Sequence, residues 1–160
     1  SIAISPTKCF LSFALRPCGL LLVYSPDKKD DKQLQTSLNL VIRARGSSFE
    51  HAITRAFVKA MINDRSKLEA EHKGALERVA KAEAIWRKFV KGTPIEYLYS
   101  PEYAGLFRNP KAKEGAQVQL YNAHIYPVFA DSRCRQNVTG IPSDEKIAAG
   151  HVKAFAEQCY

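Results

Sequence analysis

The chain has 160 residues, of which 46% are apolar and 25% charged, and its net charge is +8. This length is enough for one domain with one buried core, and the composition excludes a wholly disordered chain. Arg16 interrupts the best apolar stretch, which falls short of the roughly 20 residues that cross a bilayer, so we predict no transmembrane segment. The positive charge favours a polyanionic neighbour, although solubility alone also accounts for it.

The first 26 residues contain Lys8 and Arg16 but no acid, and the first carboxylate is Asp27. This composition is similar to that of an organelle-targeting sequence, and it leads us to expect a mitochondrial location. The simpler interpretation of the same residues is two strands of the mature fold. Two apolar runs, residues 9–15 and 20–24, flank a turn that contains proline and glycine, and together they predict a β-hairpin.

Residues 34–45 predict the clearest strand of the chain. Apolar and polar residues alternate from Leu34 to Arg45, and Gly46 ends the pattern. In such an alternating strand, one set of side chains faces a core, and the other set is exposed to solvent or covered by a polar partner.

Residues 47–91 predict a long amphipathic helical segment that needs a partner surface. A capping box at residues 47–50 starts it, and a break is expected at Asn63–Asp64, followed by a second capping box at residues 66–69. The first half carries an apolar stripe that must face a core. From residue 66 to residue 91 we predict a firm helix about 39 Å long, whose narrow apolar seam consists of Leu68, His72, Ala75, Val79, Ala82, Trp86 and Phe89. A partner helix or a second copy of the chain can dock on this seam.

The remainder of the chain is less regular. Residues 93–115 are rich in tyrosine and proline, which predicts an extended aromatic arm laid over a surface, with a short helix near residues 101–107. A strand is expected near residues 117–126 and a loop over residues 131–142. Ser143 is expected to cap a final helix, which buries the stripe formed by Ile147, Ala148, Val152, Phe155 and Cys159.

No residue pattern indicates catalysis or a cofactor. The phosphate-binding, dinucleotide-binding, nucleophile-elbow and zinc-protease motifs are absent from the sequence. Of the four histidines, His72 is expected to pack in the helical seam, whereas His51 and His151 lie beside apolar stripes. His124, between two tyrosines, has no nearby residue in the sequence that completes a nucleophilic site. We therefore predict neither catalytic nor metal-binding residues.

The four cysteines do not have the spacing of a zinc site. Two disulfides, Cys9–Cys18 and Cys134–Cys159, are permitted by the even count. In a reducing compartment the same residues would be small buried hydrophobes, and we favour free thiols.

Two groups of residues are candidates for binding a partner. The aromatic anchors are Trp86, Phe89, Tyr97, Tyr99, Tyr103 and Phe107, because large aromatic side chains are enriched at protein interfaces. The candidates for binding a polyanion are Arg43, Arg45, Arg108, Lys111 and Lys113. Basic side chains interleaved with aromatic ones also suit RNA, in which bases stack on rings while phosphates contact lysine or arginine.

The sequence therefore predicts a single α+β domain over residues 1–160, in which a small antiparallel sheet packs against a long central helix and a C-terminal helix. The expected function is that of a non-catalytic accessory or structural subunit, which binds other protein subunits of a larger assembly in an organelle. The alternatives are an RNA-binding protein of a ribonucleoprotein particle and a secreted, disulfide-bonded binding domain.

Overall fold

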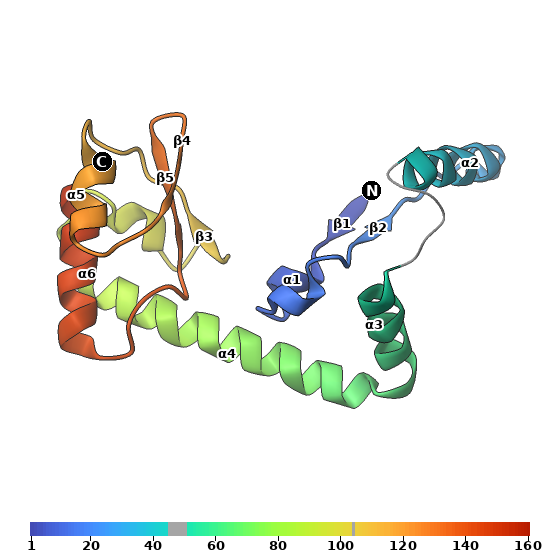
Figure 1. Ribbon diagram of the computed structural model, residues 1–160, viewed down its shortest axis with the longest axis horizontal. Coiled ribbons are helices and arrows are strands. Elements are labelled where there is room, and N and C mark those ends of the chain that lie inside the picture. The colour runs from blue at the N-terminus through green and yellow to red at the C-terminus, as the bar shows by residue number, and fades with distance from the viewer. Residues whose placement is uncertain (45–50, 104) are drawn as a thin grey trace. The chain divides into compact units, whose positions relative to one another are not determined.

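The structure is a computed structural model that describes residues 1–44, 51–103 and 105–160. The protein is mixed α+β, as predicted, with two small antiparallel sheets, a long helix and a C-terminal helix (Figure 1). Its contacts divide the chain into two compact units, residues 1–75 and residues 76–160. We call these unit 1 and unit 2. That the whole chain is one domain stays a prediction.

Unit 1 begins with a two-stranded ladder. Strand β1 (Ile2–Ile4) pairs antiparallel with β2 (Leu20–Leu22), and the short helices α1 (Pro6–Cys9) and η1 (Phe13–Leu15) lie between them. The predicted strand in residues 20–24 is confirmed. The predicted strand over residues 9–15 is wrong, because Pro6 begins a helix there, at a position where its fixed φ angle suits a first helical turn.

The predicted strand over residues 34–45 is also wrong, since residues 28–44 form the helix α2 (Lys28–Ala44). The side chain of Asp27 accepts a hydrogen bond of 2.9 Å from the backbone N–H of Lys29, which caps the helix start. Leu34, Leu38 and Val41 follow each other at helical spacing and give the helix an apolar stripe. No residue of α2 is buried.

Helices α3 (Ala52–Asn63) and α4 (Arg65–Phe89) meet at Asp64, which confirms the predicted break. The N–H of Asp64 donates to the carbonyl of Ala60 at 2.8 Å, and the carbonyl of Asp64 accepts from Lys67 at 3.0 Å. The second capping box is therefore wrong, because residue 66 already lies inside α4 and Glu69 pairs with Arg65 at 2.8 Å. The first capping box lies outside the described residues.

The predicted helix over residues 66–91 is confirmed as α4. Every residue of its predicted seam is buried or half-buried, from Leu68 to Phe89. The helix ends at Phe89, and the turn that follows contains Gly92 with a positive φ angle of 74°, a conformation that glycine adopts without steric cost. The side chain of Glu96 accepts a hydrogen bond from the N–H of Gly92 at 2.8 Å.

Unit 2 is built around Trp86, whose side chain has no exposed surface. Tyr99, in the short helix η2 (Glu96–Tyr99), stacks on the indole at 5.0 Å between ring centroids, and Phe155 meets it edge-on at 5.7 Å. The indole N–H donates to the carbonyl of Val138 at 3.0 Å. One side chain thus joins three segments that are distant in the sequence.

A three-stranded antiparallel sheet borders this core. Its strands are β3 (Phe107–Arg108), β4 (Val128–Ala130) and β5 (Arg133–Asn137), in the order β3-β5-β4. Asp131 and Ser132, both with positive φ, connect β4 to β5, as in the tight turns that match the twist of a hairpin. The loop predicted over residues 131–142 is therefore wrong in part, because it includes the strand β5.

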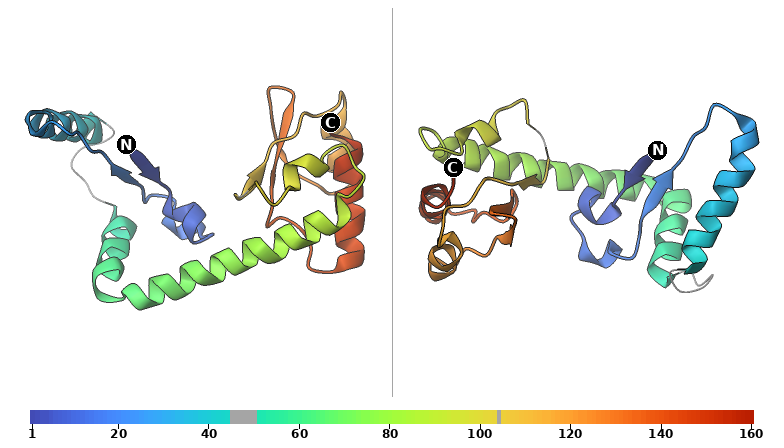
Figure 2. Two further views of the ribbon diagram at one scale, coloured as in Figure 1. Left: turned by 180° about the vertical axis from the view of Figure 1, so that it is seen from behind. Right: turned by 90° about the horizontal axis from the view of Figure 1, so that it is seen from above.

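Two helices complete unit 2. Helix α5 (Ala116–Asn122) replaces the predicted strand near residues 117–126, which is wrong; its residues Ala116 and Leu120, four apart, are buried. Helix α6 (Glu145–Glu157) confirms the predicted C-terminal helix and crosses the second half of α4 at a steep angle (Figure 2). Its cap is Asp144 rather than Ser143, because the Asp144 carboxylate accepts from the N–H of Ile147 at 2.9 Å.

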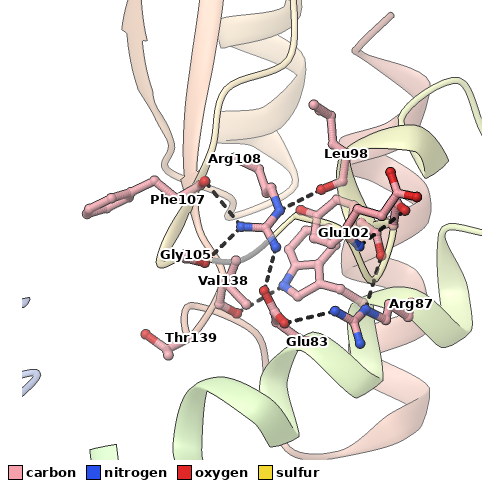
Figure 3. A network of polar contacts seen from close by, with 12 residues as sticks. Glu83, Arg87, Leu98, Glu102, Gly105, Phe107, Arg108, Val138 and Thr139 are labelled. Carbon is pink, nitrogen blue, oxygen red and sulfur yellow. Dashed lines mark hydrogen bonds and ion pairs between the residues drawn. The ribbon is translucent and has the colours of Figure 1, made fainter. Parts of the chain in front are cut away.

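The segment predicted as an arm is fixed to unit 2 by a buried ion pair (Figure 3). Arg108 is 5% exposed and pairs with Glu83 of α4, while its other N–H groups donate to the carbonyls of Leu98 at 2.6 Å and Gly105 at 2.8 Å. Arg87 donates to Glu83 at 3.1 Å. The short helix expected near residues 101–107 is wrong, since the helical turn lies earlier, at Glu96–Tyr99.

We expect Glu83→Ala to lower the free energy of unfolding by about 3–5 kcal/mol, because the substitution leaves Arg108 as a buried, uncompensated charge. Urea unfolding of the purified protein, followed through Trp86 fluorescence, measures this. Glu145→Ala is the control: it breaks an exposed ion pair with Lys88, and we expect a change within about 0.5 kcal/mol. Equal effects of the two substitutions would contradict a structural role for the buried pair.

Candidate interaction site

Unit 1 contains an apolar groove of about 480 Å³. Its walls come from the β1–β2 ladder, from α1, from α3 and from the first turns of α4. The residues that line it are Ile4, Pro6, Cys9, Phe10, Leu20, Phe57, Met61, Arg65, Leu68, Glu69 and His72. Because eight of these eleven side chains, from Ile4 to Leu68, are hydrocarbon or sulfur-containing, the groove suits an apolar rather than a charged ligand.

Aromatic contacts hold the floor of the groove together. Phe10 meets Phe57 edge-on at 5.7 Å between ring centroids and also contacts the ring of His72 at 5.7 Å. The Nδ1 atom of His72 lies 2.8 Å from the carbonyl oxygen of Cys9. A carbonyl only accepts, so the Nδ1–H of His72 donates this hydrogen bond. His72 is a packed residue, as predicted, and it joins α4 to α1.

Unit 1 exposes further apolar side chains outside the groove. On the β1–β2 ladder, Ile2 lies opposite Leu22 and Ile4 opposite Leu20, which puts these four side chains on one face. The side chains of Phe13 and Tyr24 are 85% and 84% exposed, and Ile62 of α3 is 74% exposed. Further exposed apolar residues of unit 1 are Leu21, Val23, Leu40, Val41, Ile42, Ile53, Val58 and Met61.

Few side chains of unit 1 are buried. Among the residues of unit 1 that the structure describes, the buried side chains are only those of Pro6, Cys18, Phe57 and Ala75. The α3 stripe was expected to face a core, yet within α3 only Phe57 is buried. Many exposed apolar side chains beside an apolar groove are typical of an interaction site.

The predicted aromatic anchors divide into two sets. Trp86 and Tyr99 pack inside unit 2, and Phe89 packs against the same core. These three residues therefore stabilise the fold of unit 2 and are not available for binding a partner. The seam of α4 is covered by its own chain at Ala82, Trp86 and Phe89, whereas Leu68 and His72 line the groove of unit 1. Tyr97, Tyr103 and Phe107 are exposed.

The predicted polyanion-binding residues divide in the same way. Arg108 is buried and paired with Glu83, so it is not available to a ligand. Arg43 is exposed on α2, and Arg45 lies outside the described residues. Lys111 and Lys113 lie together beside the ring of Tyr160, with Nζ–centroid distances of 6.0 and 5.6 Å.

A second groove, of about 780 Å³, runs beside these two lysines. It is lined by residues 111–118 together with Phe129, Ser132 and Tyr160. Lys113 is held by a hydrogen bond of 2.8 Å from its ammonium group to the carbonyl of Glu157. The structure therefore brings together two of the five predicted basic residues with an aromatic ring, an arrangement that suits stacking next to phosphate contacts.

All four cysteines carry free thiols. Cys134 and Cys159 are nevertheless in contact, with their sulfur atoms 3.4 Å apart and no exposed surface on either residue. Cys9 is half-buried beside the groove of unit 1, and Cys18 is buried in unit 1.

Among the residues of unit 2 that the structure describes, two buried side-chain polar atoms have no hydrogen-bond partner, namely the hydroxyl of Tyr99 and Nε2 of His151. Burial raises the pKa of Tyr99 far above its usual value, and burial lowers the pKa of His151. Both side chains contact Trp86. Tyr99 and His151 therefore stay uncharged in the folded chain at neutral pH, and they act in packing.

Over the described ranges of the chain, no group of three or more histidine, cysteine, aspartate or glutamate side chains is placed to hold a metal ion. Within the same ranges, none of the helices combines the length and apolar character that crossing a membrane requires.

The protein is α+β, with one well-packed unit and one unit that exposes an apolar groove. No family model matches the sequence, and no curated protein or solved structure is similar to it.

We expect the free energy of unfolding to fall as the pH drops below about 6.5, because the unfolded chain then protonates His151 while the folded chain resists it. The loss from this one residue is at most about 1.4 kcal/mol per pH unit. His151→Phe keeps an aromatic ring against Trp86 and should flatten the dependence between about pH 7.5 and pH 5.5, measured by urea unfolding. The control is His124→Gln, because His124 is exposed, and this substitution should leave the pH dependence unchanged. If the free energy of unfolding of His151→Phe depends on pH as steeply as that of the unchanged chain, this account is wrong.

Proposed function

We propose that the protein is a non-catalytic subunit of a larger protein assembly, which it joins through the apolar groove and surrounding surface of unit 1. The observation that carries the proposal is the contrast between the many exposed apolar side chains of unit 1 and its few buried ones. An organelle as the setting remains a prediction from the sequence.

The free energies involved support a partner. Each large apolar side chain contributes about 1.5–3 kcal/mol when it is buried rather than exposed. A two-stranded ladder alone is marginally stable in water, and three or more strands or a packed helix are needed. Helix α2 buries no residue, whereas most of the stability of a helix in a protein comes from the packing of its amphipathic face. Unit 1 therefore gains most of its stability when another surface covers it.

The form of the groove indicates what kind of partner fits. Its floor is aromatic, formed by Phe10 and Phe57, and its rim carries the exposed ion pair between Arg65 and Glu69. An apolar floor with a polar rim is the composition of protein interfaces. An amphipathic helix presenting residues at i, i+3, i+4 and i+7 is the natural occupant of such a groove.

Affinity purification of the tagged chain from its native source, with mass spectrometry of the partners, tests this proposal. We expect Met61→Glu, a charge placed on the groove, to reduce recovery of the main partner at least about tenfold, the equivalent of about 1.4 kcal/mol. Ile147→Glu is the matched control, since Ile147 is an exposed residue of α6 in unit 2. It should leave recovery unchanged. Equal recovery with both variants would contradict a role for unit 1.

The isolated chain offers a further check. We expect the purified protein to self-associate or to unfold in more than one step, because unit 1 exposes apolar surface and lacks a core of its own. A monomer by light scattering with one cooperative transition would count against the assembly proposal.

The second candidate is an RNA-binding protein of a ribonucleoprotein particle. The observation that favours it is the placement of Lys111 and Lys113 around the ring of Tyr160, beside a groove of about 780 Å³. Such a site provides phosphate contacts together with a surface on which a base stacks.

If this second function holds, single-stranded RNA binds at low salt with an affinity that falls steeply as salt rises. Replacing Lys111 and Lys113 by Ala should reduce the magnitude of the slope of log affinity against log salt by about 1–2. Lys146 and Lys153, on α6, give the control pair. Fluorescence anisotropy with a labelled oligonucleotide measures the affinity of both double variants at several salt concentrations. Absence of binding at low salt would contradict the RNA-binding function.

A further inference from the structure

Two cysteines that are 25 positions apart in the sequence meet inside unit 2. The sulfur atoms of Cys134 and Cys159 lie 3.4 Å apart, and neither residue has exposed surface. A disulfide bond is about 2.05 Å long, so the sulfurs need to approach by little more than 1 Å for a bond to form. Cys9 and Cys18 have no comparable contact among the described interactions.

Backbone hydrogen bonds hold both cysteines in place. The N–H of Cys134 donates to the carbonyl of Pro110 at 3.1 Å, and Ala112 bridges Cys159. The N–H of Lys113 donates to the carbonyl of Gln158 at 2.9 Å, and that of Tyr160 to the carbonyl of Lys111 at 2.9 Å. Residues 110–113 are therefore bonded to the start of β5 on one side and to residues 158–160 on the other.

We propose that Cys134 and Cys159 are a redox site, which a low-molecular-weight disulfide such as oxidised glutathione converts to an intrachain disulfide bond. The bond would lock the end of the segment 93–115 between β5 and the residues that follow α6. This inference concerns unit 2 alone and does not rest on the partner proposed for unit 1.

The two thiols differ in character. The hydrogen bond between the two thiols lowers the pKa of Cys134 and raises the pKa of Cys159. Since the thiolate is the attacking form, Cys134 is the first nucleophile.

The exchange proceeds in two balanced steps. The Cys134 thiolate attacks one sulfur of oxidised glutathione, the glutathione disulfide breaks, and one glutathione thiolate leaves and takes up a proton. Cys159 loses its proton and attacks the Cys134 sulfur of the mixed disulfide, which releases the second glutathione. Two protein thiols are oxidised, one glutathione disulfide is reduced to two thiols, and two electrons and two protons move to glutathione.

Because both sulfur atoms are covered, the bond forms as the chain folds or when residues 158–160 locally open. The test is therefore made at equilibrium. The full chain is refolded in glutathione redox buffers, a second sample is held in denaturing urea with the same buffers, and thiols are alkylated before tryptic digestion. Trypsin isolates Cys134 in residues 134–135 and Cys159 in residues 154–160, whereas Cys9 and Cys18 stay on one peptide because Arg16 precedes a proline.

We expect the refolded chain to give the covalent pair of peptides 134–135 and 154–160. The ratio of the oxidised to the reduced cysteine pair should be on the order of a hundredfold higher in the folded chain than in urea. The reason is that a disulfide stabilises the folded chain by closing a loop, and folding stabilises the disulfide by the same free energy. The variant Cys9→Ser with Cys18→Ser should give the same ratio.

A ratio no higher in the folded chain than in urea would overturn the proposal. As a second readout, oxidised protein should melt at a higher temperature than reduced protein, and Cys159→Ala should melt at the same temperature in both buffers. If oxidation raises the melting temperature of Cys159→Ala as much as that of the unchanged chain, the bond lies elsewhere and the proposal also fails.

Discussion

The packing around Trp86 is the interaction on which unit 2 depends. The indole is fully covered, stacks on Tyr99, meets Phe155 edge-on and donates to the carbonyl of Val138. It thereby joins α4 to η2, to the loop after β5 and to α6, and the buried pair of Arg108 with Glu83 fixes the intervening segment. No described residue of unit 1 has an equivalent role. Phe57 is its largest buried side chain, and the groove beside it stays open.

This asymmetry is what links structure to function. Unit 2 has a buried apolar core, a buried ion pair between Arg108 and Glu83, and a C-terminal helix capped by Asp144. Unit 1 has amphipathic helices and an apolar ladder face whose apolar surfaces are largely uncovered. Exposed apolar surfaces promote aggregation of the chain. A partner that covers these surfaces prevents that aggregation. The proposal of an assembly subunit rests on that physical argument and on no resemblance to another protein.

The sequence predicted α4 and α6 well because their apolar residues recur at helical spacing over many turns, a signal that an alternating strand cannot produce. It failed for α2 and α5, where short windows fit both periods. Leu34, Leu38 and Val41 follow helical spacing, yet Leu40 and Ile42 complete an alternating pattern with Leu34 and Leu38. In α5, Val118 and Leu120 alternate with glutamines, although Ala116 and Leu120 form the buried helical pair. The hairpin turn at Asp131–Ser132 lacks the glycine that usually marks such turns.

For the candidate site, the sequence indicated the residue types but not their partners. Aromatic density near Trp86 was read as an anchor for another protein, whereas Tyr99 and Arg108 serve the chain's own core. The groove of unit 1 was missed because Phe10, Phe57 and His72 come from three separate elements, and only the uncovered α3 stripe pointed to it. The even number of cysteines permits a bond between Cys134 and Cys159, but their separation of 25 positions in the sequence does not reveal that the two side chains are in contact.

Amide hydrogen exchange of the isolated chain tests the central claim most directly, since it reports the free energy of opening along the backbone. The account predicts strong protection in the second half of α4 and in α6, limited only by global unfolding, and weak protection in α2, α3 and the β1–β2 ladder. Uniform protection of both units at the global level would show that unit 1 is complete by itself and would contradict the account.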